Sequence, residues 1–124
     1  MTDQPHYPQQ VPIEAYGNGG FRFADMSHIG SLLCVPSGVY AWSVQNMDTL
    51  SFEDFERVFK EADALEFLLL GTGKKQIFPT PEIKHLFDEA NMGLDAMDTG
   101  AAARTYNVLL AEKRNVAAAL ISVE

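Results

Sequence analysis

The stretch GLDAMDTGAAARTYNVLLAEKRNVAAALISV, residues 93–123, decides the fold. It predicts a short strand at residues 94–97, a helix from about residue 101 to residue 112, and a nearly all-apolar strand at residues 116–123. An Asp-Thr-Gly turn separates the first strand from the helix, and either of its first two residues can cap the helix. Because strand, helix and strand in this order form a crossover connection, we expect two parallel strands in one sheet.

The same alternation extends upstream. The run LEFLLL at residues 65–70 is almost continuously apolar and ends in a Gly-Thr-Gly turn, which is typical of a strand buried on both faces. Thr80 as N-cap and Pro81 at the first helical position predict a helix that stops near Gly93. We expect this helix to bury Ile83, Leu86, Phe87 and Ala90. An earlier helix, capped by Ser51, is expected to bury the stripe Phe52, Phe55, Val58, Phe59 and Ala62.

The first third of the chain has a different pattern. Residues 13–16 and 21–23 flank a glycine-rich turn, which predicts a β-hairpin. Residues 29–35 and 39–44 flank a Pro-Ser-Gly turn and predict a second hairpin, with Tyr40, Trp42 and Val44 on one face. The predicted fold class is therefore α/β, with N-terminal β-hairpins followed by alternating strands and helices and a mixed, partly parallel sheet.

Length and composition indicate one domain. The chain has 124 residues, of which 47% are hydrophobic and 21% charged, within the range of single globular domains. Its polar opening MTDQPHYPQQ lacks the features of a secretory signal and of a transit peptide. We predict a flexible tail at residues 1–10 and a single α/β domain at residues 11–124.

Charge and cysteine content restrict partners and compartment. A formal net charge of −8 and a pI near 4.7 exclude affinity gained by neutralising phosphates, so no nucleic-acid partner is expected. Cys34 is the only cysteine, which rules out an intramolecular disulfide and favours a reducing interior. The apolar runs are shorter than the roughly 20 residues that cross a bilayer. We expect no membrane span and a cytoplasmic, bacterial-type location.

Two loops are candidates for ligand binding, because ligands of open α/β sheets bind at the carboxyl ends of the parallel strands. A helix N-terminus with nearby cations suits a small anion or the phosphates of a nucleotide. The same residues have ordinary structural roles as turn glycines, caps and solvated lysines, and the sequence leaves both interpretations open. The candidate crevice residues are Gly71, Thr72, Gly73, Lys74, Asp98, Thr99 and Arg104.

Other chemistries have little support in the sequence. The first loop lacks the third glycine of a dinucleotide fingerprint, and no helix opens directly from it, so no cofactor is predicted. His6, His28 and His85 share no metal-ligand spacing, so no metal is predicted. No nucleophile motif contains Ser37, and Cys34 lies in an apolar strand, where a thiol is inert. Asp98 is either a general base or, more simply, a helix cap, and no catalytic residue is assigned.

Three parts of the chain carry a family resemblance: FRFADMSHIGSLLCVPSGVYAW in the first third, LLLGTG at residues 68–73, and the stretch from residue 93 to residue 121. Together they resemble the family of mitochondrial respiratory complex I assembly factor 3 and its small bacterial and archaeal relatives. It implies a three-layer α/β domain and no established enzymatic reaction. It also implies a protein partner, either another assembly factor or subunits of a respiratory complex, with peripheral membrane association through that partner.

Two functions follow as hypotheses. The first is a non-enzymatic accessory or assembly protein, for which Tyr16, Phe21, Phe23 and Trp42 near the hairpin turns are candidate contact residues or, alternatively, core residues. The second is a small-anion or nucleotide-binding protein, or an enzyme acting on such a ligand, that uses the crevice between the two loops.

Overall fold

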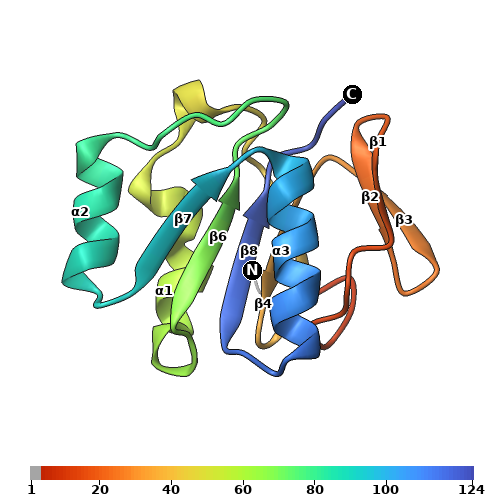
Figure 1. Ribbon diagram of the computed structural model, residues 1–124, viewed down its shortest axis with the longest axis horizontal. Helices are drawn as coiled ribbons and strands as arrows, with labels where there is room; N and C mark the ends of the chain where they lie inside the picture. Colours follow the sequence, from red (N-terminus) through yellow and green to blue (C-terminus); the bar gives the residue numbers. More distant parts are fainter. Residues whose placement is uncertain (1–3) are drawn as a thin grey trace.

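A mixed five-stranded sheet organises the computed structural model, which describes residues 4–124 (Figure 1). Its strands, in the spatial order β5-β4-β8-β6-β7, are β4 (Ser31–Val35), β5 (Gly38–Trp42), β6 (Phe67–Gly71), β7 (Gly93–Met97) and β8 (Val116–Leu120). β6 runs parallel to both β7 and β8, whereas β4 is antiparallel to β5 and β8. The predicted α/β class with a mixed, partly parallel sheet is confirmed.

A second, antiparallel sheet forms from the first third of the chain. Its strands, in spatial order, are β1 (Ala15–Gly17), β2 (Gly20–Phe23) and β3 (Met26–Ile29). Both predicted hairpins are present, but the single strand expected at residues 29–35 is wrong. Gly30 has a φ of 99°, a left-handed conformation that ends β3 and lets the chain cross to β4 in the larger sheet.

The helical segments begin at the predicted caps. α2 (Pro81–Glu89) starts after Thr80, whose Oγ1 accepts from the Ile83 N–H at 3.4 Å, and α3 (Thr99–Ala111) starts after Asp98. Ser51 forms a capping box with Asp54. The single helix expected after Ser51 is broken into three short pieces: the 3-10 turn η2 (Phe52–Phe55), α1 (Glu56–Lys60) and the 3-10 turn η3 (Ala62–Ala64). A further 3-10 turn, η1 (Met47–Thr49), precedes them.

Two expected core residues in these segments are exposed. Phe52 is 60% exposed, because a 3-10 turn has about three residues per turn and shifts the apolar stripe out of phase. Ala90, which follows the last residue of α2, is also exposed. The other predicted stripe residues are buried or partly buried in the core.

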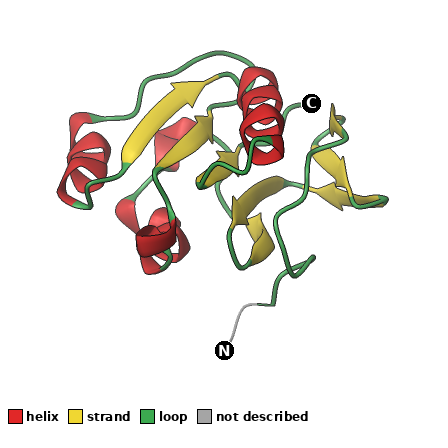
Figure 2. Cartoon of the chain, turned by 60° about the horizontal axis from the view of Figure 1, so that its bottom comes forward, coloured by secondary structure: helices red, strands yellow, loops and turns green. Residues whose placement is uncertain are grey.

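Three layers result from this arrangement. α1 and α2 cover one face of the five-stranded sheet, while α3 and the three-stranded sheet cover the other. In Figure 1, α3 lies in front of the sheet and α1 behind it, and Figure 2 shows the three-stranded sheet beside α3. β6 is buried on both faces as predicted, with Leu68 and Leu70 in one core cluster and Leu69 in the other. Tyr40 and Trp42 share the first cluster.

Residues 6–10, which fall in the predicted tail, contact the larger sheet. The His6 N–H donates to the Val39 carbonyl at 2.7 Å, and the Val39 N–H donates to the Tyr7 carbonyl at 3.0 Å. Gln10 Nε2 donates to the Val116 carbonyl at 2.7 Å. Whether this segment is flexible in solution stays a prediction, as does the boundary at residue 11. Among residues 4–124, no helix has the length and apolar character that crossing a membrane requires.

Candidate functional site

The two predicted loops meet at the carboxyl-end edge of the parallel strands. The Thr99 N–H donates to the Gly73 carbonyl at 2.8 Å, and the Gly73 N–H donates to Thr99 Oγ1 at 2.9 Å. Thr99 Oγ1 in turn donates to the Ile121 carbonyl at 2.7 Å. The fully buried Thr99 hydroxyl therefore joins the β6 loop, the start of α3 and the end of β8.

Packing explains the two glycines of the first loop. A Cβ on Gly71 would lie 3.0 Å from both Cα and Oγ1 of Thr99, so the loops can approach only without a side chain there. Gly73 has a φ of 105°, which favours glycine. Both glycines thus serve the junction between the loops.

Thr72 stabilises the loop that follows it, at residues 73–77, through hydrogen bonds. Its backbone N–H donates to the Met97 carbonyl at 2.9 Å, and its hydroxyl donates to the Lys75 carbonyl and accepts from the Ile77 N–H at 3.1 Å. Gln76 Nε2 also donates to the Ala96 carbonyl, at 2.9 Å. These bonds fix the conformation of the loop between β6 and α2.

The charged candidates Lys74, Asp98 and Arg104 form no ion pair with one another. Asp98 Oδ1 accepts from the Ala101 N–H at 2.9 Å and caps α3. Arg104 is exposed on α3, where its Nη1 and the Tyr16 hydroxyl crowd the position that a Gly100 side chain would occupy. Lys74 is exposed on the loop after β6. The structure thus brings Gly71, Gly73 and Thr99 together, and a ligand role for the seven predicted residues stays a prediction.

Two adjoining grooves open at this edge of the sheet. One, of about 380 Å³, is lined by Thr72, Gly73 and Lys74 together with residues 45–48 and 121–124. The other, of about 300 Å³, lies beside Phe78 and is lined by residues of η1, the loop after β6 and the start of α2. Met47, Asp48 and Ile77 line both grooves. Asp98, Thr99 and Arg104 line neither.

Sequence reasoning missed the most exposed apolar side chains at this edge. Phe78 is 76% exposed and Ile77 is 46% exposed. They lie in the segment KQIFP, which has no periodic pattern, and only the unusual presence of two adjacent large apolar residues in a loop could have drawn attention to them. Of the predicted contact aromatics, Phe21, Phe23 and Trp42 are buried, and Tyr16 is 44% exposed.

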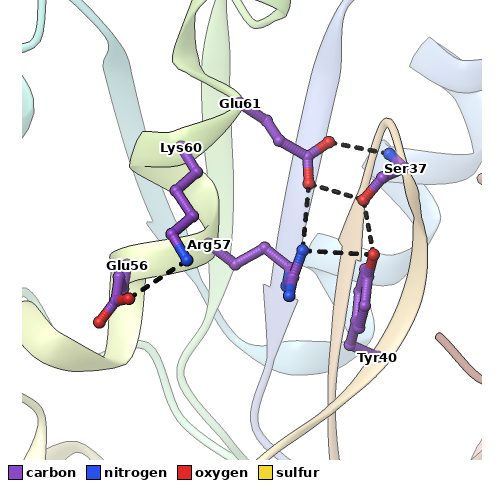
Figure 3. A network of polar contacts seen from close by, with 6 residues as sticks. All are labelled: Ser37, Tyr40, Glu56, Arg57, Lys60 and Glu61. Atoms are coloured by element: carbon purple, nitrogen blue, oxygen red, sulfur yellow. Dashed lines mark hydrogen bonds and ion pairs between the residues drawn. The ribbon is translucent and has the colours of Figure 1, made fainter. Parts of the chain in front are cut away.

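A polar network lies between the β4-β5 hairpin and α1 (Figure 3), and two of its members, Tyr40 and Arg57, also line a groove of about 480 Å³. Glu61 accepts from the Ser37 N–H at 2.8 Å and from the Ser37 hydroxyl at 2.7 Å. Arg57 lies 4.1 Å from the centre of the Tyr40 ring and 3.9 Å from Glu61 Oε2. Each of these polar groups contacts another, so the network fastens the turn between β4 and β5 to α1.

The polar residues of α3 fasten the N-terminal segment. Asn107 bonds to the backbone of Ile13, and Tyr106 bonds to the backbone of Val11. Burial raises the pKa of the Cys34 thiol to about 12, and burial likewise raises the pKa of Tyr106. Both groups therefore stay protonated at neutral pH, and Cys34 is an unreactive core residue.

His28 is held at the junction of β3 and β4. Its Nε2 lies 3.0 Å from the Ser31 carbonyl, and its ring centre lies 5.0 Å from that of His6. Burial lowers the pKa of His28, with His6 adding a smaller effect in the same direction. Within residues 4–124, no cluster of three or more His, Cys, Asp or Glu side chains is placed to hold a metal ion.

Comparisons with known proteins identify relatives over nearly the whole chain. The model of a family described as a protein of unknown function, DUF498/DUF598, matches residues 13–121. NADH dehydrogenase [ubiquinone] 1 alpha subcomplex assembly factor 3 of Mus musculus is 28% identical over 95% of this chain, which spans 64% of the length of that relative. An uncharacterized protein of Rhodobacter capsulatus is 34% identical, with 95% of this chain and 90% of that protein covered.

A solved structure shares the fold of this chain. The crystal structure of a protein described as an outer membrane protein of Bartonella henselae has a TM-score of 0.92 and 51% identity, covering 96% of this chain and 100% of that one.

Proposed function

Since the chain belongs to the DUF498/DUF598 family, we propose that it is a non-enzymatic accessory protein that assists the assembly of a larger protein complex by binding a partner protein. Its similarity to assembly factor 3, over 95% of its own length, supports an assembly-type role. Another assembly factor or a respiratory-complex subunit is the partner that this similarity suggests. The proposal includes a cytoplasmic location, with membrane contact made through the partner.

One observation carries the proposal beyond similarity. Ile77 and Phe78 present apolar surface on a loop whose backbone is fixed by Thr72 and Gln76. Exposed large apolar side chains next to a groove are characteristic of protein-binding surfaces, and a loop that is already ordered loses little entropy on binding. This arrangement supports recognition of a protein.

Capture from native cells tests the proposal. The tagged full chain is purified from a lysate that includes the membranes, and the proteins that accompany it are identified by mass spectrometry. We expect respiratory-complex subunits or a dedicated small partner. Recovery of no specific protein, together with a metabolite released when the purified chain is denatured, would overturn the proposal.

The alternative, binding of a small anion or nucleotide between the two loops, gains no support from the relatives. The buried hydroxyls of Thr72 and Thr99 are already bonded to backbone groups. Arg104→Ala and Thr72→Val separate the two functions. A ligand site predicts that both variants lose the thermal stabilisation given by inorganic phosphate or ATP. The assembly role predicts that neither compound stabilises even the unmodified chain, and that Arg104→Ala still captures the partner.

A further inference from the structure

The groove beside Phe78 combines apolar and polar surface and contains one charged side chain. Its apolar residues are Met47, Leu50, Ile77, Phe78, Pro79 and Ile83, and its polar residues are Thr80 and the charged Asp48. The Asp48 carboxylate forms no ion pair with any residue in the range 4–124. A partner segment that buries its apolar side chains here would partly dehydrate this carboxylate. The cost of that dehydration is offset only if the segment also supplies a positive charge that pairs with it.

The wall of the groove that contains Asp48 is part of an acidic stretch. Residues 45–56 contain four carboxylates, Asp48, Glu53, Asp54 and Glu56, and no Lys or Arg. Glu56 is paired with Lys60 at 3.4 Å, whereas Asp48, Glu53 and Asp54 form no ion pair among residues 4–124, although Asp54 accepts from the Ser51 N–H. The whole chain has a net charge of −8, so its long-range field adds to the local one. Lys74 lines the adjoining groove, beside the C-terminal residues.

We propose that this groove binds a basic amphipathic segment of a partner protein, whose apolar side chains pack against Phe78 and Ile77 and whose Lys or Arg side chain pairs with Asp48. The inference rests on the proposed function and specifies the chemistry of the partner. The groove favours a polypeptide over a bilayer because it is concave, and the acidic surroundings would repel anionic lipid. Thr72 acts as a positioning residue, because its hydroxyl holds the Ile77 backbone.

A peptide selection tests the chemistry of the groove directly, whatever the identity of the partner. The full chain is immobilised and screened against a phage-displayed library of random peptides, and the recovered sequence is synthesised and measured by fluorescence anisotropy. We expect peptides rich in Lys or Arg and large apolar residues, with binding that weakens as salt rises. Peptides that are acidic, or that show no bias toward basic residues, would overturn the proposal.

Three variants locate the binding. Phe78→Ser should weaken peptide binding at least tenfold. Asp48→Lys should weaken it and reduce its salt dependence. Ile29→Ser, at a residue 81% exposed on β3, is the matched control and should bind as the unmodified chain does. All three sites are exposed, and unchanged circular dichroism and urea midpoints verify folding. Equal binding by Phe78→Ser and the unmodified chain would contradict the proposed site.

A vesicle experiment tests a membrane surface as the occupant. Sedimentation with vesicles of phosphatidylcholine and phosphatidylglycerol is measured for the unmodified chain and for Phe78→Ser. We expect neither to sediment. Sedimentation that depends on Phe78 would assign the surface to lipid and overturn the proposal.

Photo-crosslinking separates this inference from the proposed function. p-Benzoylphenylalanine is placed at position 78 or position 29 of the chain in its native cells, and the crosslinked peptides are sequenced. Crosslinks from position 78 to a basic, apolar segment support the inference. Crosslinks to a partner from position 29 alone would overturn the inference and leave the assembly role standing, whereas failure to capture any partner in the native purification would overturn the assembly role itself.

Discussion

Asn107 holds both backbone groups of Ile13, a residue 94 positions earlier in the chain: its Nδ2 donates to the Ile13 carbonyl at 2.8 Å, and its Oδ1 accepts from the Ile13 N–H at 2.8 Å. One amide side chain thus bonds Ile13 as a neighbouring β-strand would. The hydroxyl of Tyr106, the residue before Asn107, donates to the Val11 carbonyl at 3.1 Å. α3 therefore fixes the segment that leads into the three-stranded sheet.

Asn107→Ala should lower the free energy of unfolding by about 2 kcal/mol, because two hydrogen bonds are lost and the Ile13 N–H and carbonyl lose their partner. Urea denaturation measures this as a lower midpoint at constant slope. Glu112→Ala, an exposed change after the same helix, is the control and should stay within about 0.5 kcal/mol of the unmodified chain. Equal midpoints for the two variants would contradict a stabilising role for the Asn107 amide.

Thr99→Val should cost about 2 to 3 kcal/mol, because it removes the hydroxyl that bonds Gly73 and Ile121 and leaves both backbone groups without that partner. Thr99→Ser retains the hydroxyl and loses one methyl group, so its cost should be about 1 kcal/mol. Chemical denaturation of both variants gives the comparison. The junction does not depend on the hydroxyl if Val is tolerated as well as Ser.

The free energy of unfolding should fall above pH 9, because of the buried Cys34 thiol. The Cys34 thiol has a pKa of about 12 in the folded chain against an ordinary value of 9.0, so between these values the unfolded chain releases its proton while the folded chain retains it. The contribution is present in full below pH 9 and is lost as pH rises toward 12. Tyr106, whose pKa is also raised, adds to the loss.

Urea midpoints at pH 7, 9 and 10.5 measure this dependence, and Cys34→Ala should flatten it. An identical pH profile in the two proteins would show that the thiol does not contribute. Thiol reagents at pH 8 should modify Cys34 only after denaturant is added, because the side chain is fully buried.

Two neighbouring glutamines test the predicted tail. Gln10→Ala removes the bond from Nε2 to the Val116 carbonyl and should cost about 1 kcal/mol. Gln9→Ala, at an exposed position, should have almost no effect. Thermal unfolding of the pair decides between the alternatives: if both variants melt at the temperature of the unmodified chain, residue 10 belongs to a flexible tail.

Local patterns in the sequence were sufficient to predict much of the fold. The apolar run before Gly71 predicted a strand buried on both faces, and Thr80 and Pro81 predicted the start of α2, because caps and periodicity depend on near neighbours. The break at Gly30 was missed, because the apolar pattern continues through it and only the pairing of β3 with β2 requires the turn.

The candidate site was predicted in part. The order of the parallel strands predicted that the two loops meet. The hydrogen bond from the Thr99 hydroxyl to the Ile121 carbonyl could not be predicted, because it joins segments that are distant in the sequence. The bond between Asn107 and Ile13 is of the same kind. The exposure of Phe78 could not be predicted either, since an apolar residue in a loop is buried or exposed according to what packs over it.

The position of β8 has a consequence for how the protein is made. β8 follows every other described strand in the chain, yet it lies between β4 and β6 and joins the antiparallel half of the sheet to the parallel half. On the ribosome, the β4-β5 hairpin and the β6-β7 pair therefore each keep an unpaired strand edge until residues 116–120 emerge. A nascent chain stalled before that point would be a substrate for chaperones.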